Sequence, residues 1–238
     1  MKRNLLLISN STNPGEDYLD WPKVIIKEFC NRHSVKEVLF IPYAGVSMGY
    51  DKYEERVKEV FDSLDLELKS IHRFDNAEEA VRNAKCIAVG GGNTFHLLAE
   101  LYDNNVLELI RERAMDGMPY MGWSAGSNIA GPSIKTTNDM PIIEPRSFDA
   151  MNIVPFQINP HYTDFFDPEH GGETRDERLN EFQVLNPEMY IAGIREATAL
   201  LVEKGKLSLI GRNNKMKVFR GKDTPVEYAL DEDINFLL

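Results

Sequence analysis

Only two of the 238 residues are cysteines, Cys30 and Cys86. Two thiols are too few for a disulfide framework or for a zinc site built from four thiolates. The sequence also lacks the spacings of the common histidine–carboxylate and calcium-loop metal motifs, although acids and a histidine gather at residues 164–173. We therefore expect no metal ion, no other cofactor and a cytoplasmic location.

Long apolar runs are absent as well. No stretch approaches the roughly 20 apolar residues that a membrane-spanning helix needs. The apolar residues 5–8 follow a basic start, but the run is short and no small-residue cleavage site comes after it. This segment therefore indicates a first strand and not a leader peptide, and we expect no membrane partner.

Basic residues are in the minority, since 27 Lys and Arg stand against 38 Asp and Glu, for a net charge of −11. This excess of negative charge disfavours binding to nucleic acid and to anionic membranes. It also repels acidic ligands at long range. An acidic substrate would have to be captured by cations inside the site, which is feasible because charges are screened beyond about 8 Å at physiological salt.

Short apolar runs alternate with amphipathic segments over the first half of the chain. We expect strands at residues 5–9, 38–41, 66–71, 86–89, 119–122, 190–194, 199–202, 208–210 and 215–219. We expect helices at residues 24–29, 51–64, 77–84, 95–102, 106–115 and 174–185. This alternation predicts a three-layer α/β fold, with a mostly parallel sheet between two helical layers, in a single domain of residues 1–238. Functional groups should gather at the carboxyl ends of its strands.

The most informative segment is residues 122–126, Gly-Trp-Ser-Ala-Gly, which joins a short apolar run to a helix-forming segment. A sharp strand-to-helix turn leaves no room for a Cβ two residues before or after its centre, which explains the two glycines. The turn exposes the Ser124 hydroxyl above the sheet and directs the following N–H groups toward the same space. This context favours Ser124 as a nucleophile, although a helix-capping serine would give the same pattern.

A serine nucleophile needs a base that removes its proton. Of the five histidines, His161 follows a strand-like segment at the start of an irregular region, and it is preferred over His170. The base in turn needs a carboxylate that orients it. Glu196 follows a predicted strand and Asp139 lies downstream of the nucleophile, and the pattern alone leaves both open.

Residues 90–94, Gly-Gly-Gly-Asn-Thr, follow an apolar strand and precede a helix. A phosphate cradle is one interpretation, but the segment lacks the Lys-Ser/Thr ending of a P-loop and the spacing of a dinucleotide fingerprint. A second interpretation is a loop whose backbone N–H stabilises an oxyanion. The third is a tight turn without a chemical role.

Several segments together resemble the peptidase E family of α-aspartyl dipeptidases. They are residues 90–95 (Gly-Gly-Gly-Asn-Thr-Phe), 122–126, 136–141 (Thr-Thr-Asn-Asp-Met-Pro) and 157–161 (Gln-Ile-Asn-Pro-His), with shorter likenesses at 6–12, 41–46 and 172–175. The resemblance covers nearly the whole chain in the same order. It implies the fold of the class I glutamine amidotransferase domain, a flavodoxin-like arrangement, with serine where those enzymes have cysteine.

The resemblance also implies roles for individual residues. Ser124 would be the nucleophile and His161 the base, with Glu196 as the third member and Asp139 as its rival. Ser127, one helical turn past the nucleophile, departs from the family pattern, and we expect it to have a supporting or neutral role and not to react.

Backbone and substrate contacts follow from the same resemblance. The N–H groups of Gly92 and Ala125 would form the oxyanion hole. Arg175 and Asn93 would bind the substrate, and Arg175 is chosen because a guanidinium can hold an aspartyl carboxylate with two hydrogen bonds.

The function implied is that of a serine dipeptidase, which hydrolyses dipeptides with N-terminal aspartate through an acyl-enzyme on Ser124. One alternative is a related serine acyl hydrolase that acts on isoaspartyl or cyanophycin-type linkages. Another is a non-catalytic module that binds an anion over residues 90–92. The expected partner is a small peptide, and the chain is expected to be a monomer or a homodimer.

Overall fold

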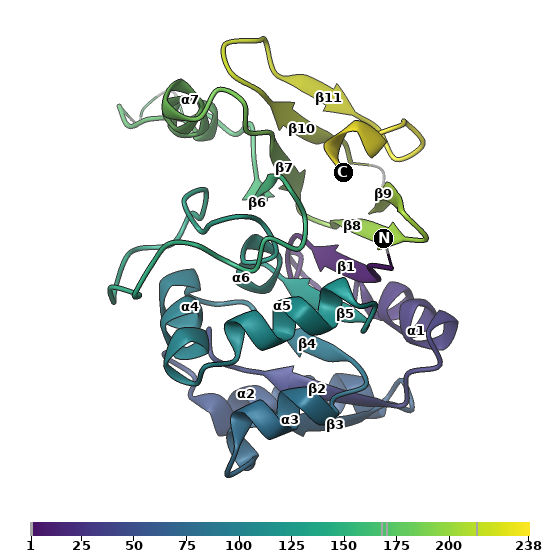
Figure 1. Cartoon of the computed structure of the whole chain (residues 1–238). Helices are drawn as coiled ribbons and strands as arrows, with labels where there is room; N and C mark the ends of the chain where they lie inside the picture. Colours follow the sequence, from purple (N-terminus) through teal and green to yellow (C-terminus); the bar gives the residue numbers. More distant parts are fainter. Residues whose placement is uncertain (1, 168, 170, 213) are drawn as a thin grey trace.

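The computed structural model describes residues 2–167, 169, 171–212 and 214–238 (Figure 1). Its strands are β1 (Leu5–Ile8), β2 (Glu37–Ile41), β3 (Glu67–Ser70), β4 (Ile87–Val89), β5 (Tyr120–Trp123), β6 (Gln157–Tyr162), β7 (Ile191–Arg195), β8 (Thr198–Glu203), β9 (Lys206–Gly211), β10 (Met216–Phe219) and β11 (Val226–Tyr228). Its helices are α1 (Lys23–Arg32), α2 (Tyr50–Asp62), α3 (Ala77–Asn83), α4 (Thr94–Asp103), α5 (Leu107–Met115), α6 (Ala125–Asn128) and α7 (Arg175–Leu185), with short 3₁₀ turns η1 (Ile71–Arg73) and η2 (Asn235–Leu237).

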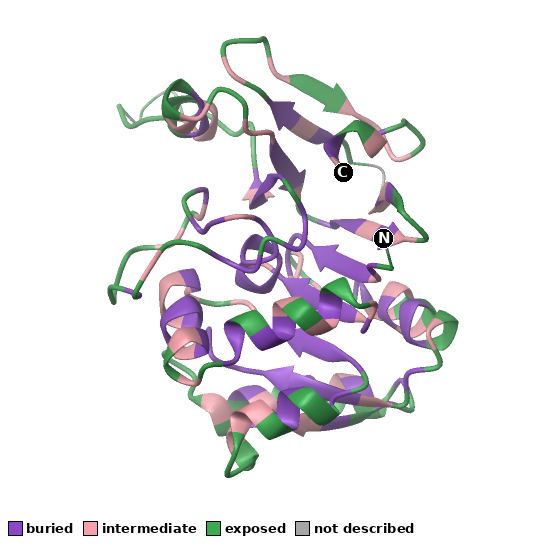
Figure 2. Ribbon diagram, in the orientation of Figure 1, coloured by how far each residue is buried: buried purple, intermediate pink, exposed green. Residues whose placement is uncertain are grey.

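The larger sheet has seven strands in the order β3-β2-β4-β5-β1-β8-β9. Its first five strands are parallel, and β8 and β9 complete it as an antiparallel hairpin. Strands β1, β4 and β5 are buried along their whole length, as expected for parallel strands covered on both faces (Figure 2).

Alternating side chains of β1 divide the core into two layers. Leu5 and Leu7 pack with α3, α4, α5 and α6, whereas Leu6 and Ile8 pack with α1 and α2 on the opposite face. The three-layer α/β prediction is therefore confirmed. No helix among the described residues is long and apolar enough to cross a membrane.

A second sheet of four strands lies beside the first, in the order β11-β10-β7-β6, with α7 next to it (Figure 1). Strands β6 and β7 are parallel, and β10 pairs antiparallel with β7 and β11. Strands were expected near β7 and β10, but their separation into another sheet was not. Apolar alternation identifies a strand but not the strand with which it pairs. The local sequence pattern therefore does not show to which of the two sheets a strand belongs.

The two sheets are joined at the carboxyl end of β1 by the buried side chain of Ser9. Its hydroxyl donates a hydrogen bond of 2.8 Å to the Ile194 carbonyl in β7 and accepts one of 2.9 Å from the His161 N–H in β6. The Ser9 N–H donates to the Thr198 carbonyl in β8 at 2.9 Å. One residue thus links β1 to strands of both sheets.

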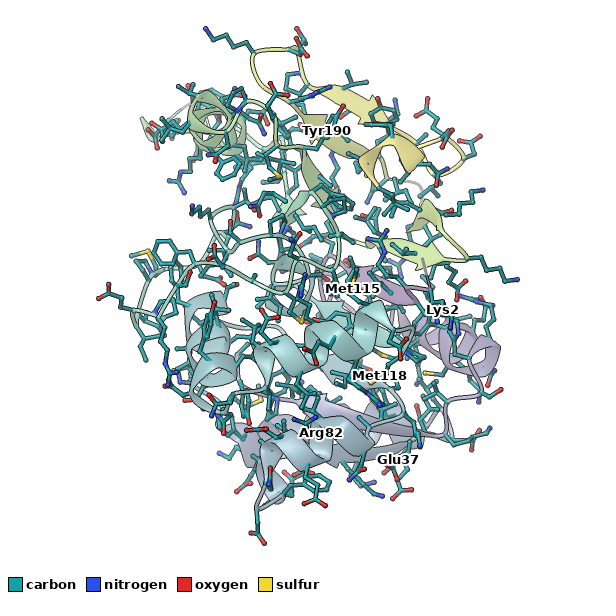
Figure 3. The ribbon with its side chains drawn as sticks, viewed as in Figure 1. Lys2, Glu37, Arg82, Met115, Met118 and Tyr190 are labelled. Atoms are coloured by element: carbon teal, nitrogen blue, oxygen red, sulfur yellow. The ribbon has the colours of Figure 1, made fainter. Side chains whose placement is uncertain are left out.

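The 3₁₀ turn η2 makes a second connection near the C-terminus. Asn235 accepts a hydrogen bond of 2.8 Å from the Leu207 N–H in β9. Phe236 packs edge-on against Tyr190, at the start of β7, with ring centroids 5.6 Å apart (Tyr190 is labelled in Figure 3). The turn therefore holds the edge of the large sheet to the small one.

Two glycines allow the turn between β5 and α6 to pack tightly against β4. A Cβ at Gly122 would overlap the Gly126 carbonyl, and a Cβ at Gly126 would overlap the Val89 carbonyl. Both neighbours are backbone atoms of the sheet or helix and cannot rotate away. The glycine spacing recognised in the sequence is thus required by close backbone packing.

We expect Gly126→Ala to lower the free energy of unfolding by about 3 kcal/mol, because the added methyl group must push β4 and α6 apart. Urea unfolding monitored by circular dichroism measures this change. Gly171→Ala is the matched control, since a Cβ there meets no described atom within 4 Å. Equal stability of the two variants would contradict the packing argument.

Candidate active site

Ser124 occupies a strained turn at the carboxyl end of β5. Its backbone φ is +53° and its ψ is −112°, a region that residues with a side chain rarely adopt. The turn is held by hydrogen bonds from the Ser124 N–H to the Ile8 carbonyl at 3.1 Å and from the Asn128 N–H to the Ser124 carbonyl at 2.9 Å. Because surrounding contacts impose this conformation, the side chain stays partly exposed at the edge of the sheet.

Ser127 supports the same turn from within. Its buried hydroxyl lies 2.7 Å from the Ile8 carbonyl oxygen and 2.8 Å from that of Gly122. These contacts tie the first turn of α6 to both β1 and β5. The supporting role expected for Ser127 agrees with this placement.

His161 reaches Ser124 because β6 is irregular near its end. The pairing with β7 shifts register between Asn159 and Tyr162, and His161 itself has a φ of +53°. Such a bulge re-aims a side chain that regular alternation would direct elsewhere. The Nε2 atom of His161 lies 3.0 Å from the Ser124 Oγ.

Glu196 follows β7 directly and contacts the other side of the imidazole. Its Oε1 lies 2.9 Å from the His161 Nδ1. The turn is shaped by Ala197, whose φ is +62° and whose N–H donates a hydrogen bond of 2.8 Å to the Asn10 side chain. Asn214 donates a hydrogen bond of 2.8 Å to the Glu196 carbonyl.

These three side chains form a directed hydrogen-bond chain. An ionised carboxylate only accepts hydrogen bonds, so Nδ1 must carry the imidazole proton and Nε2 is left to accept the serine proton. The side chains of His161 and Glu196 are 39% and 47% exposed, and solvent therefore screens their attraction. The carboxylate thus contributes mainly orientation and tautomer choice.

A cavity of about 420 Å³ opens beside Ser124 and His161. It is lined by backbone and small or uncharged side chains: Ser11, Tyr18, Ala44, Gly45, Val46, Ser47, Met48, Tyr53, Gly91, Gly92 and Asn93. Its described lining contains no Lys, Arg, Asp or Glu. A small peptide fits this volume, but a charged substrate side chain would find no countercharge there.

The backbone N–H groups of Gly92 and Ala125 have no backbone acceptor among the described residues, and neither have those of the adjacent Gly91 and Gly126. Ala125 is the first residue of α6, and the first N–H groups of a helix have no acceptor within that helix. Gly92 has a φ of +137°, and a Cβ there would overlap the Ala44 carbonyl. Both predicted oxyanion donors are thus available for a ligand, and the conformation at Gly92 requires glycine.

Asp139 does not contact His161 in the described structure. Its Oδ2 accepts hydrogen bonds from the Thr94 N–H at 2.7 Å, the Thr94 hydroxyl at 2.5 Å and the Thr137 hydroxyl at 3.2 Å. A carboxylate at this point caps α4 and interacts favourably with the helix dipole. Asp139 therefore stabilises the helix after the glycine loop, while Glu196 occupies the position beside the imidazole.

Asn93 lines the cavity, but much of its side chain is committed elsewhere. Its oxygen accepts a hydrogen bond of 3.0 Å from the His96 N–H, and its nitrogen donates one of 2.8 Å to the Met140 carbonyl. The side chain caps α4 from the first residue before the helix. One amide hydrogen is left for a substrate, so the predicted binding role has little geometric support.

Arg175 begins α7 and is not among the described residues that line the cavity. It is half-buried, and burial lowers the pKa of its guanidinium from the ordinary value. Thr174 and Glu177 form a capping box at the start of α7, and this cap holds the backbone from which the Arg175 side chain projects. The predicted role of Arg175 in substrate binding stays a prediction.

The remaining histidines serve other contacts. His33 lies 2.6 Å from Glu203, His72 lies 3.0 Å from Asp51, and the His96 ring lies 2.6 Å from the Tyr43 carbonyl. His170, the weighed alternative base, lies outside the described residues.

One described group of potential metal ligands exists, formed by Asp51, Glu54 and His72 within 4.8 Å of one another. The side chain of Arg73 pairs with both of its carboxylates, at 2.9 Å and 2.7 Å. A cation is thus already supplied by the chain, and the group lies outside the cavity at Ser124.

Ser9 and Asn10 are site residues that the sequence analysis missed. Ser9 holds the His161 backbone and Asn10 holds the turn after Glu196. The sequence feature that could have identified them is a polar pair directly after a buried strand, at the edge of the sheet where functional groups gather.

A serine, a histidine and a glutamate joined in this order at the carboxyl edge of a parallel sheet are typical of serine hydrolases. Comparison with known proteins agrees, since the model of peptidase family S51 matches residues 5–210. The chain belongs to this family and is a serine peptidase.

Similar relatives cover the full chain. Peptidase E of Nostoc sp. (strain PCC 7120) is 48% identical over all of this chain and 98% of its own length. Peptidase E of Shewanella denitrificans is 47% identical over all of both chains.

Solved structures agree on the fold. A crystal structure from Listeria monocytogenes EGD-e matches with a TM-score of 0.65 and 27% identity, over 88% of this chain and 98% of that one. A peptidase from an acI-B1 Actinobacterium matches with a TM-score of 0.69 and 19% identity, over 98% and 97% of the two chains.

Proposed function

We propose that this serine peptidase hydrolyses dipeptides with N-terminal aspartate, with Ser124 as nucleophile, His161 as general base and Glu196 as the carboxylate that orients it. The observation that carries these roles is the hydrogen-bond chain of 3.0 Å and 2.9 Å that ends at a hydroxyl open to the cavity. The aspartyl preference rests on the likeness to peptidase E relatives over the full chain.

In the first half of the reaction, Ser124 Oγ attacks the carbonyl carbon of the aspartyl residue while His161 Nε2 takes the hydroxyl proton. Negative charge that develops on the carbonyl oxygen is stabilised by the N–H groups of Gly92 and Ala125. His161 then gives its proton to the leaving amine as the peptide bond breaks. An aspartyl ester on Ser124 remains.

In the second half, His161 removes a proton from water, which attacks the ester carbonyl through a second oxyanion. The C–O bond to Ser124 breaks, and the serine oxygen recovers its proton from His161. Free aspartate leaves, and the enzyme returns to its starting state. Glu196 stabilises the imidazolium that forms in each half.

Arg175 is our proposal for the group that binds the aspartyl carboxylate, although it lies outside the cavity. Its side chain makes no ion pair with the described residues, and the cavity itself lacks a cation. A net charge of −11 makes a local cation necessary for an acidic substrate. This role requires the Arg175 guanidinium to reach the aspartyl carboxylate of a substrate bound at Ser124.

We further propose a cytoplasmic location and a monomeric or dimeric state. Both cysteines are buried, and burial raises the pKa of the Cys30 thiol to about 12. Such thiols are unreactive and make no disulfide, as suits a reducing compartment. The alternative of a non-catalytic anion-binding module does not fit a member of a peptidase family.

Ser124→Ala should lower kcat for Asp-Leu about 10⁴-fold or more, because no acyl-enzyme can form. Release of free aspartate, measured by an amino-acid assay, checks this, with unchanged thermal unfolding as the control for folding. Retained hydrolysis would end the serine mechanism. Faster cleavage of the β-linked isomer than of α-Asp-Leu by the wild type would favour the isoaspartyl alternative.

Glu196→Gln should lower kcat roughly 10²- to 10⁴-fold, since the amide can donate to Nδ1 and so no longer holds the imidazole in the tautomer that accepts the serine proton. Asp139→Asn is the matched control, and its kcat should fall less than about tenfold because Asn still caps α4. Steady-state kinetics of the two variants decide between the rival carboxylates. The reverse ranking would give the third place to Asp139.

Arg175→Met should raise KM for aspartyl dipeptides about tenfold or more, while cleavage of Ala-X peptides stays at its low wild-type rate. Arg178→Met, one turn further along α7, removes an exposed arginine that lies 3.7 Å from Glu173 and serves as the control. Equal losses on aspartyl and alanyl peptides, or equal effects of the two variants, would exclude Arg175 as the carboxylate clamp.

A further inference from the structure

Tyr53 fills a slot between two glycine-containing loops beside Ser124. Its side chain projects from α2 and is 4% exposed. A Cβ at Gly45 would come within 2.5 Å of the Tyr53 ring, and a Cβ at Gly90 within 2.5 Å of its hydroxyl oxygen. The absence of side chains at both positions leaves space for this one phenol, so the slot is shaped to its ring.

The hydrogen bonds of the Tyr53 hydroxyl have a single possible direction. An indole N–H only donates and a carbonyl oxygen only accepts. The hydroxyl therefore donates to the Gly91 carbonyl at 2.9 Å, and toward Trp123 Nε1, at 3.1 Å, it can only accept. Trp123 shares its one N–H between this oxygen and the Tyr18 hydroxyl, which lies at 2.9 Å. Tyr18 donates to the same oxygen at 3.1 Å and completes its hydrogen bonding.

This arrangement connects the nucleophile turn to the glycine loop. Trp123 directly precedes Ser124, and its indole stacks on Phe40 with ring planes 8° apart. Phe40 in turn packs edge-on against Tyr53 at 5.1 Å. The tyrosine thus connects the residue before the nucleophile to the glycine loop that packs directly against Ser124.

The Gly91 carbonyl and the Gly92 N–H belong to one peptide unit. Described peptide bonds are all trans, so these two groups point in opposite directions across that unit. A hydrogen bond that fixes the carbonyl toward Tyr53 also fixes the N–H away from it. That N–H has no backbone acceptor among the described residues, and Gly92 lines the cavity with Ser124.

We propose that Tyr53 is a positioning residue for the oxyanion hole, which orients the Gly91–Gly92 peptide through its hydroxyl. The inference rests on the proposed role of the Gly92 N–H in the serine mechanism. Tyr53 acts through the backbone and does not touch the reacting atoms.

The loop needs such a restraint because it consists of three consecutive glycines. Glycine adopts many backbone conformations at little cost, and a peptide between two glycines can reverse its orientation. Reversal would direct the Gly91 carbonyl oxygen where the N–H had been, and it would repel the developing oxyanion. At the two ends of the loop, the Gly90 N–H is held by the Ile41 carbonyl at 3.0 Å and the Asn93 N–H by the Ala44 carbonyl at 2.9 Å. The peptides between them have no such backbone bond, and the Tyr53 hydroxyl contacts the one between Gly91 and Gly92.

The burial of Tyr53 suits this task. Burial raises the pKa of its phenol to about 12, so the hydroxyl stays protonated and can donate at any working pH. The restraint therefore does not depend on pH near neutrality.

Tyr53→Phe tests the proposal because it removes one hydroxyl and keeps the ring in its slot. We expect kcat for an aspartyl dipeptide to fall about tenfold, less than the 10²- to 10³-fold typical of losing an oxyanion donor, with KM changed less than about twofold. The rate at which a fluorophosphonate modifies Ser124, followed by mass spectrometry, should fall by a similar factor. A purely structural role would not produce this selective loss in kcat.

Two further variants separate positioning from folding. Gly90→Ala keeps Tyr53 but displaces its hydroxyl, and it should reproduce the loss in kcat if Tyr53→Phe is too unstable to assay. Tyr50→Phe removes another hydroxyl of α2, from a residue that is not among the described residues lining the cavity, and it should lose less than about threefold. Thermal unfolding of each variant reports its folding.

The fluorophosphonate separates the failure of this proposal from the failure of the proposed function. If the wild type reacts at Ser124 but cleaves no aspartyl dipeptide, the substrate assignment is wrong and the labelling rates still test Tyr53. If wild type and folded Tyr53→Phe react equally fast and have equal kcat, the positioning role is overturned. A wild type without reaction at Ser124 contradicts the serine mechanism, and the positioning proposal with it.

Discussion

The contact between His161 and Ser124 is the interaction on which the rest of the site depends, because its two partners come from different sheets. Ser124 ends a strand of the seven-stranded sheet and His161 lies in the four-stranded sheet, yet their side-chain atoms are 3.0 Å apart. A displacement of one sheet by about 1 Å would break this geometry. Ser9 and the turn η2 hold the sheets together and so belong to the machinery of the site.

Three of the nine described non-glycine residues with positive φ lie at the same place. Ser124, His161 and Ala197 all have positive φ values although none is glycine. Each such residue costs of order 1–3 kcal/mol and persists only where tertiary contacts impose it. The glycines at 122 and 126, the β-bulge in β6 and the Asn10 side chain provide those contacts. The fold therefore stabilises a site whose local conformations are unfavourable by themselves.

Much of the large sheet could be predicted from the sequence, because its buried parallel strands read as short apolar runs. The sequence singles out Ser124 as a candidate nucleophile because the spacing of the two glycines around it reflects a steric requirement between residues that are close in the chain. Assigning the small sheet, preferring Glu196 over Asp139 and placing Ser9 all depend on contacts between distant segments, which local pattern does not encode. For Glu196, family resemblance supplied the preference that residue pattern left open. The role of Arg175 likewise comes from the resemblance alone, since it is not among the described residues that line the cavity.

The most direct test of the account is a crystal structure of the chain after fluorophosphonate has reacted with it, since the adduct imitates the tetrahedral intermediate. The account predicts phosphorus bonded to Ser124 Oγ and the phosphoryl oxygen within hydrogen-bond distance of the Gly92 and Ala125 N–H groups, with His161 still paired to Glu196. A phosphoryl oxygen turned away from both N–H groups, or phosphorus on another residue, would contradict it.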